Sequence, residues 1–141
     1  MPQTDDPCTA EVGDVLRPFV RETGFAAWNR FAAVNYEFVP IHMDDEAGRA
    51  AGYPTAFGMG NLQWSYLHNL LRDWLGDRGK ILKLAVQFRA PNLKGQTVTA
   101  RGVITSTRDE PDGRAIDLDV WTEDQNGTRL APGSATVVLR P

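Results

Sequence analysis

Residues 61–75 read NLQWSYLHNLLRDWL and carry the strongest helical pattern of the chain. Its apolar side chains recur at helical spacing around much of the circumference: Leu62, Trp64, Tyr66, Leu67, Leu70, Leu71, Trp74 and Leu75. A helix that is apolar on most sides is usually buried, because a surface helix keeps a polar face toward water. Gly76 is expected to end it. We therefore predict one buried central helix, around which the remaining elements pack.

The residues after this helix change from helical to strand periodicity. Residues 82–89, LKLAVQFR, alternate between apolar and other side chains, which predicts a half-buried strand. The same alternation recurs in three later segments, 97–105, 115–122 and 134–139. Turn residues separate the segments at 92–95, 112–113 and 126–127. Because these turns favour hairpins, we expect the four strands to form an antiparallel meander.

The residues before the central helix predict one strand and two further helices. Residues 15–23, VLRPFVRET, are interpreted as an edge strand, because the proline removes one donor from a sheet ladder. Residues 24–34, GFAAWNRFAAV, carry apolar side chains at helical spacing and predict an amphipathic helix. A short helix is expected over residues 45–51, with Asp44 as its N-cap. This order indicates an α+β fold with an antiparallel sheet wrapped on one helix.

Composition and charge exclude several classes of protein. The chain has 141 residues, of which 42% are hydrophobic, about the size of one average domain with a sizeable core. The net charge is −3 with Lys and Arg scattered along the chain, so a nucleic-acid partner is not expected. Cys8 is the only cysteine, which excludes an internal disulfide and a multi-cysteine zinc site.

The N-terminal residues predict neither a membrane segment nor a signal peptide. Residues 1–10, MPQTDDPCTA, are polar and acidic, whereas a signal peptide is basic and then apolar. No segment of the chain is apolar for the length of a membrane span. We expect residues 1–10 to be a flexible tail, residues 11–141 to form a single domain, and the protein to be soluble and cytoplasmic without a membrane partner.

An acid and an imidazole lie close together in residues 35–45, NYEFVPIHMDD. Glu37 precedes His42, and Pro40 fixes the backbone between them. Imidazole titrates near neutral pH and suits a general acid or base. Such a pair in a loop is more often exposed or turn-stabilising than catalytic, so spacing alone does not decide its role.

This loop and the order of elements resemble the MaoC-like hydratase and dehydratase family of the hotdog fold. In that family a loop of pattern Asp-x-Asn-Pro-x-His supplies the acid and the base, and residues 37–42 match it with Glu37 for Asp and Val39 for Asn. A Gly-rich stretch ending in His-Gly then opens the central helix, where this chain has Met59-Gly60. The resemblance implies a single hotdog, in which an antiparallel five-stranded sheet wraps around a long central helix.

The resemblance also implies a hydro-lyase that adds or removes water at the C2–C3 bond of an acyl thioester. The substrate would be an acyl-CoA or an acyl-carrier protein of fatty-acid, polyketide or sterol side-chain metabolism. The reaction needs a base for water, an acid for C2 and a donor for an enolate oxygen. His42 and Glu37 are the catalytic candidates, and which of them is the acid stays open. The candidates for oxyanion or substrate binding are Gly60, Met59, Asn61, Tyr36 and His68.

Plainer interpretations of these residues remain. His68 is more often a hydrogen-bonded core or interface histidine, and Met59 is equally well a core contact. Asp44 and Asp45 are best explained as helix caps. Neither a cofactor nor a metal is expected, because the sequence contains no metal-ligand cluster and no phosphate loop.

Two other functions also remain open. The altered Asn and His-Gly positions favour a non-catalytic hotdog subunit that shapes the acyl tunnel beside an active partner. In a thioesterase or an unusual lyase on the same fold, Glu37 would activate water against the thioester carbonyl. A single hotdog leaves sheet edges open, so we expect a homodimer or a heterodimer with a related hotdog chain.

Overall fold

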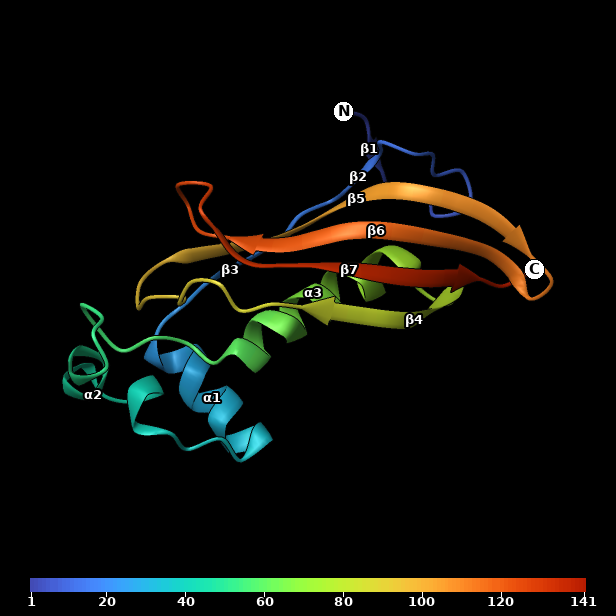
Figure 1. Cartoon of the computed structure of the whole chain (residues 1–141). Helices are drawn as coiled ribbons and strands as arrows, with labels where there is room; N and C mark the ends of the chain where they lie inside the picture. Colours follow the sequence, from blue (N-terminus) through green and yellow to red (C-terminus); the bar gives the residue numbers. More distant parts are fainter.

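A long helix, α3, lies beneath a curved sheet, and the smaller helices α1 and α2 lie on the side away from that sheet (Figure 1). This computed structural model describes residues 1–141. The elements are β1 (Gln3–Thr4), β2 (Val15–Leu16), β3 (Phe19–Glu22), α1 (Phe25–Asn35), the 3-10 turn η1 (Pro40–His42), α2 (Asp45–Ala50), α3 (Gly60–Leu75), β4 (Gly79–Val86), β5 (Thr97–Glu110), β6 (Gly113–Glu123) and β7 (Arg129–Leu139). None of the helices combines the length and the apolar character needed to cross a membrane.

The predicted central helix is confirmed. The buried side chains of α3 are Leu62, Gln63, Tyr66, Leu67, Leu70, Leu71, Trp74 and Leu75. They form one core with inward-facing residues of the sheet, including Val98, Ala100, Ile104, Ile116, Leu118, Val120, Ala135, Val137 and Leu139. Trp64 departs from the prediction, because it is 39% exposed at the edge of the sheet, where its indole N–H donates to the carbonyl oxygen of Leu84 in β4 at 3.4 Å. The α+β arrangement with a sheet around one helix is that of a hotdog.

The predicted four-strand meander is correct for three strands only. Strands β5, β6 and β7 are antiparallel neighbours in that order. Strand β4 pairs with β7 and lies at the end of the sheet, so it is not the neighbour of β5. The segment 87–96 carries the chain from β4 to the opposite side of the sheet, and periodicity cannot predict such a crossing because it reports only which face is buried. The outer edge of β4 has no partner strand.

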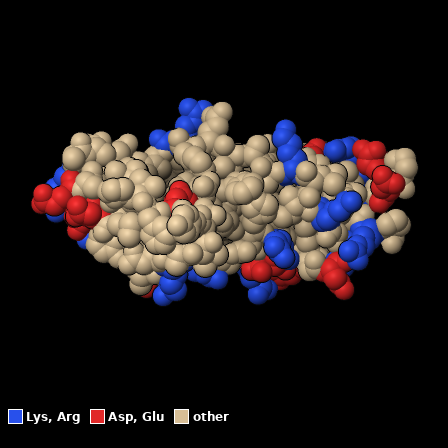
Figure 2. Space-filling model, turned by 90° about the horizontal axis from the view of Figure 1, so that it is seen from below, with Lys and Arg blue, Asp and Glu red and all other residues tan.

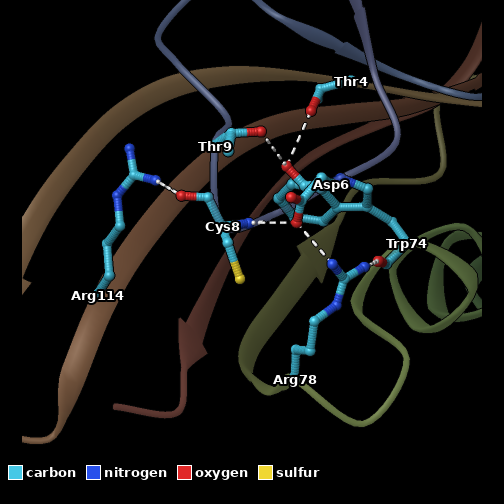
Figure 3. A network of polar contacts seen from close by, with 7 residues as sticks. All are labelled: Thr4, Asp6, Cys8, Thr9, Trp74, Arg78 and Arg114. Atoms are coloured by element: carbon cyan, nitrogen blue, oxygen red, sulfur yellow. Dashed lines mark hydrogen bonds and ion pairs between the residues drawn. The ribbon is translucent and has the colours of Figure 1, made fainter.

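The first ten residues pack onto the fold, which differs from the flexible tail that their composition predicts. Strand β1 pairs in parallel with β2, and both Thr4 and Ala10 are buried. Figure 3 shows how the carboxylate of Asp6 accepts hydrogen bonds from Arg78 at 2.6 Å and from the backbone N–H of Cys8 at 2.9 Å. Asp6 thus ties the N-terminal segment to an arginine 72 residues further along the chain.

The segments before α3 form largely as predicted. The edge strand is divided by Pro18 into β2 and β3, and α1 is confirmed. Asp44 caps α2, since its Oδ1 accepts from the backbone N–H of Glu46 at 3.1 Å. Asp45 has another role: it pairs with Lys94 and accepts from the N–H of Ala56 at 3.0 Å. The hydrogen bond from Lys94, followed by that from Ala56, holds the pKa of Asp45 below its usual value.

Candidate active site

A small cavity opens beside the N-terminus of α3. Its volume is about 220 Å³, and it is lined by His42, Tyr53, Phe57, Gly58, Gly60, Gln63, Phe88, Arg89, Ala90 and Pro91. The lining comes from four parts of the chain: the turn η1 after α1, the loop between α2 and α3, the start of α3, and the segment that leaves β4. The fold therefore brings His42 and Gly60, two of the predicted site residues, to one cavity.

His42 is buried and held by a hydrogen bond that defines its tautomer. Its Nδ1 lies 2.6 Å from the carbonyl oxygen of Phe57. A carbonyl oxygen only accepts, so Nδ1 carries the hydrogen and Nε2 of the neutral ring keeps its lone pair. Pro40 begins the turn η1, which places His42 at its end. Nε2, the ring nitrogen that is not bonded to Phe57, is thus available as a base.

Gly60 is the first residue of α3, and an aromatic ring lies close to the place that a side chain would take. The preceding residue, Met59, makes no side-chain capping bond, so the first N–H groups of the helix are uncapped. These groups and the helix dipole favour negative charge at this end. A Cβ placed on Gly60 would lie 2.7 Å from the ring of Phe88. The aromatic ring therefore packs directly over the helix start.

Glu37 lies next to the first turn of α3 but not in the cavity lining. Its Oε2 accepts from the side-chain amide of Asn35 at 2.9 Å and from that of Asn61 at 3.5 Å. Glu37 forms no hydrogen bond with His42. The expected acid and base thus flank the same helix N-terminus, with only His42 directed to the cavity.

Three of the other predicted binding residues lie elsewhere. Met59 is fully buried in the core, as its plainer interpretation predicts. Tyr36 is 87% exposed and packs edge-on against Phe38. His68 packs edge-on against Trp64, with ring centroids 4.4 Å apart, and lines a separate hollow between α3 and β4. Burial, followed by the positive charge of Arg72, lowers the pKa of His68 below its usual value.

Sequence analysis missed several residues that line the cavity. Gln63 is polar within an otherwise apolar helix face and lies three residues after Gly60, a spacing that places both on one side of a helix. This spacing, read from the sequence alone, could have identified Gln63 as a candidate site residue. No sequence pattern indicates Phe88 or Arg89 as site residues, because they reach α3 only through the crossing of the chain after β4. No group of three or more His, Cys, Asp or Glu side chains is placed to hold a metal ion.

Comparisons with known proteins agree with this fold. The profile of the MaoC like domain matches residues 11–122. The (R)-specific enoyl-CoA hydratase of Aeromonas caviae is 28% identical over 130 residues, covering 92% of this chain and 95% of the relative. The solved structure of the (R)-hydratase from A. caviae involved in PHA biosynthesis has a TM-score of 0.83 at 26% identity, covering 93% of this chain and 98% of that one.

Two further solved structures share the fold at lower identity. The ChsH1-ChsH2 complex from Mycobacterium tuberculosis matches with a TM-score of 0.82 and 20% identity, over 94% of this chain and 100% of that one. The HadBC 3R-hydroxyacyl-ACP dehydratase complex from the same organism matches with a TM-score of 0.74 and 16% identity, over 92% and 97%. With a matching profile over most of its length, the chain belongs to the MaoC-like domain family.

Proposed function

We propose that this MaoC-like hydratase or dehydratase acts at the C2–C3 bond of an acyl thioester through His42. The observation that carries the assignment is the contact between His42 Nδ1 and the Phe57 carbonyl oxygen. It leaves Nε2 as a proton acceptor inside a cavity that also contains the uncapped start of α3. A base and an anion-stabilising group in one cavity are what hydration of an enoyl thioester requires.

In the hydration direction, His42 Nε2 accepts a proton from water while the water oxygen bonds to C3. The electron pair of the double bond moves toward the thioester carbonyl, whose oxygen gains negative charge. The backbone N–H of Gly60 and the dipole of α3 stabilise that oxygen. A proton then passes to C2, either the one that His42 Nε2 accepted from water or one carried by the Glu37 carboxyl group, and completes the addition; dehydration follows the same steps in reverse.

Glu37 is the second candidate for delivering the C2 proton. Its 3.5 Å contact with Asn61 is long for a hydrogen bond, so the carboxylate is only weakly held on that side. A change in the rotamer of Glu37 is enough to redirect its carboxylate relative to the start of α3. We assign Glu37 a supporting role in proton transfer and His42 the principal one.

The proposed substrate is an acyl-CoA, because the relative from A. caviae is an enoyl-CoA hydratase and covers nearly the same length. Arg89 lines the cavity and offers a cation to the phosphates of CoA or of a carrier-protein arm. A cytoplasmic location, where acyl-CoA substrates occur, is part of this proposal.

The test is to mix the purified protein with short and long 2-enoyl-CoA and follow the enoyl-thioester absorbance, with a thiol reagent in parallel. Loss of absorbance without release of thiol is the expected result. Release of thiol would instead identify a thioesterase. An unchanged absorbance without release of thiol would count against catalysis by this chain alone.

A second candidate is a hotdog subunit that works beside a related chain. Three observations favour it: Glu37 lies outside the cavity lining, the outer edge of β4 is unpaired, and Leu82 on that strand is 56% exposed. Figure 2 shows that the face viewed from below carries few charged side chains over a broad area. Two of the similar structures are complexes of two named components.

We expect the β4 edge to pair with a second hotdog, either a copy of this chain or a related one, since exposed edges invite strand addition. Light scattering on the purified protein separates a homodimer from a monomer. A monomer that gains hydratase activity only when a related chain is co-expressed would support the subunit function.

A further inference from the structure

A buried amide on α3 adds a polar group to the candidate site. Gln63 is only 2% exposed, yet it lines the cavity with His42 and Gly60. Its Oε1 accepts a hydrogen bond of 2.6 Å from the hydroxyl of Thr122, which is 0% exposed. That length is typical of an O–H donor and short for an amide N–H donor, so the carbonyl end of the amide faces Thr122.

The other end of the amide has no partner within the protein. The Nε2 group of Gln63 carries two N–H donors, and no side chain or backbone carbonyl accepts from them. Only the indole nitrogens of Trp28 and Trp74 are fully enclosed without a partner, so Gln63 Nε2 keeps contact with open space, and Gln63 lines the cavity. Gln63 therefore presents two unused donors where a ligand would lie.

The position of this donor indicates which ligand atom it meets. Gly60 and Gln63 lie on one face of α3, about 4.5 Å apart along the helix axis. We consider a pose in which the thioester oxygen binds at the N–H of Gly60 and the acyl chain extends along the helix toward Gln63. C3 is two bonds beyond the thioester carbon, and an oxygen bound to C3 then falls beside Gln63, with His42 lining the same cavity.

We propose that Gln63 Nε2 donates a hydrogen bond to the oxygen at C3, which is the attacking water in hydration and the leaving hydroxyl in dehydration. Gln63 exchanges no proton in this step, because the proton of the water passes to His42 Nε2 as the C3–O bond forms. Thr122 acts as a positioning residue that fixes the amide. This inference rests on the proposed function and adds a specific contact to it.

The first test is binding, which needs no turnover. Isothermal titration compares butyryl-CoA with both enantiomers of 3-hydroxybutyryl-CoA, which differ from it only by the C3 hydroxyl. We expect the wild type to bind one hydroxylated ligand about 5-fold more tightly, and Gln63→Leu to lose that preference. Thr122→Val should weaken the preference, and Thr122→Ser, which keeps the hydroxyl, should retain it.

Turnover is the second readout. Gln63→Leu should lower kcat for the enoyl substrate by about 10-fold to 100-fold with little change in KM, because the contact strengthens as charge develops. Circular dichroism establishes that each variant is folded. If Gln63→Leu fails to fold, the Thr122→Val and Thr122→Ser pair tests the same contact.

The outcomes separate this inference from the proposed function. An unchanged ligand preference and kcat in folded Gln63→Leu, with activity abolished in His42→Ala, would overturn the inference and leave the function standing. A preference for the hydroxylated ligand that depends on Gln63, without any turnover, would support the contact and count against the reaction. A wild type that binds neither CoA ester would contradict both.

Discussion

The Nδ1 atom of His42 lies 2.6 Å from the carbonyl oxygen of Phe57, and the backbone N–H of Phe57 donates to the carbonyl of Ile41 at 3.1 Å. These two hydrogen bonds run in opposite directions between the loop after α1 and the segment that enters α3. They hold the imidazole against the segment that leads into α3. A base held in this way loses little orientational freedom when substrate binds.

Replacement of His42 tests the base directly. His42→Ala should lower turnover of an enoyl-CoA by about 100-fold or more, since no other imidazole lines the cavity. The adjacent Met43 is 42% exposed and lies outside the lining, so Met43→Ala is a matched control that should retain activity. Wild-type rates in folded His42→Ala, measured by enoyl absorbance, would remove the histidine from the mechanism.

Replacement of Glu37 tests the proton donor. Glu37→Gln keeps the shape of the side chain and removes its charge, and we expect kcat to fall by about 100-fold if the carboxyl group transfers the C2 proton. Asn61→Ala removes only the 3.5 Å contact that holds Glu37 and should change kcat far less. Equal and small effects of both changes would indicate that Glu37 only shapes the loop.

A methyl group on Gly60 tests the approach of the substrate to the helix start. In Gly60→Ala the new Cβ would lie 2.7 Å from the ring of Phe88. Phe88 is 55% exposed and can rotate away, so we expect a loss of stability below about 1 kcal/mol. We expect KM to rise about 10-fold, because the methyl group occupies the place of the thioester.

Two controls show whether Gly60→Ala raises KM by displacing the Phe88 ring or by blocking the substrate at the helix start. Gly24→Ala introduces a methyl group whose nearest neighbour is 3.9 Å away, and KM should not change. The Gly60→Ala and Phe88→Ala double variant should remain impaired. Recovery of normal KM in that double variant would show that displacement of the ring, and not blockage of the helix start, caused the defect.

His68 should make stability depend on pH below neutrality. Burial, followed by the charge of Arg72, lowers its pKa, so protonation is less favourable in the folded than in the unfolded state. The stabilisation is present above the ordinary histidine value of about 6.5 and is lost as the pH falls toward the lower folded value. In thermal melts between pH 7 and pH 5, His68→Gln should show a smaller decrease in Tm than the wild type. Parallel curves for the two proteins would contradict this prediction.

Removal of the first ten residues should lower stability, although their composition predicts a loose tail. The deletion removes the β1 pairing, the buried Thr4 and Ala10, and the bond from Arg78 to Asp6 (Figure 3). We expect a loss of about 1–2 kcal/mol, seen as a decrease of a few degrees in Tm. Asp6→Asn alone should cost less, because the ion pair is largely exposed. An unchanged Tm after the deletion would support the interpretation of residues 1–10 as a flexible tail.

Local patterns in the sequence are enough to predict most of the individual helices and strands. Helical spacing in residues 61–75 predicts α3, and alternation predicts the buried faces of β5, β6 and β7, because one turn of helix or two residues of strand define the buried face. Alternation fails in part for β4, where a register shift lies between Ile81 and Lys83 and Leu82 is exposed. Asp44 is recognisable as a cap from its own position and the residue that follows. The motif ending in His42, and the glycine at the start of the central helix, are likewise contained in short stretches of sequence.

Which elements meet depends on how the whole chain packs and is not contained in any short stretch of sequence. The partner of β4, the ring of Phe88 over Gly60, the bond between Thr122 and Gln63, and the bond between Arg78 and Asp6 all join residues far apart in the chain. A hydrophobic pattern shows that a face is buried but not what covers it, so these pairings follow from packing the whole core. The same packing directs Glu37 toward Asn61 and leaves His42 in the cavity beside Gln63.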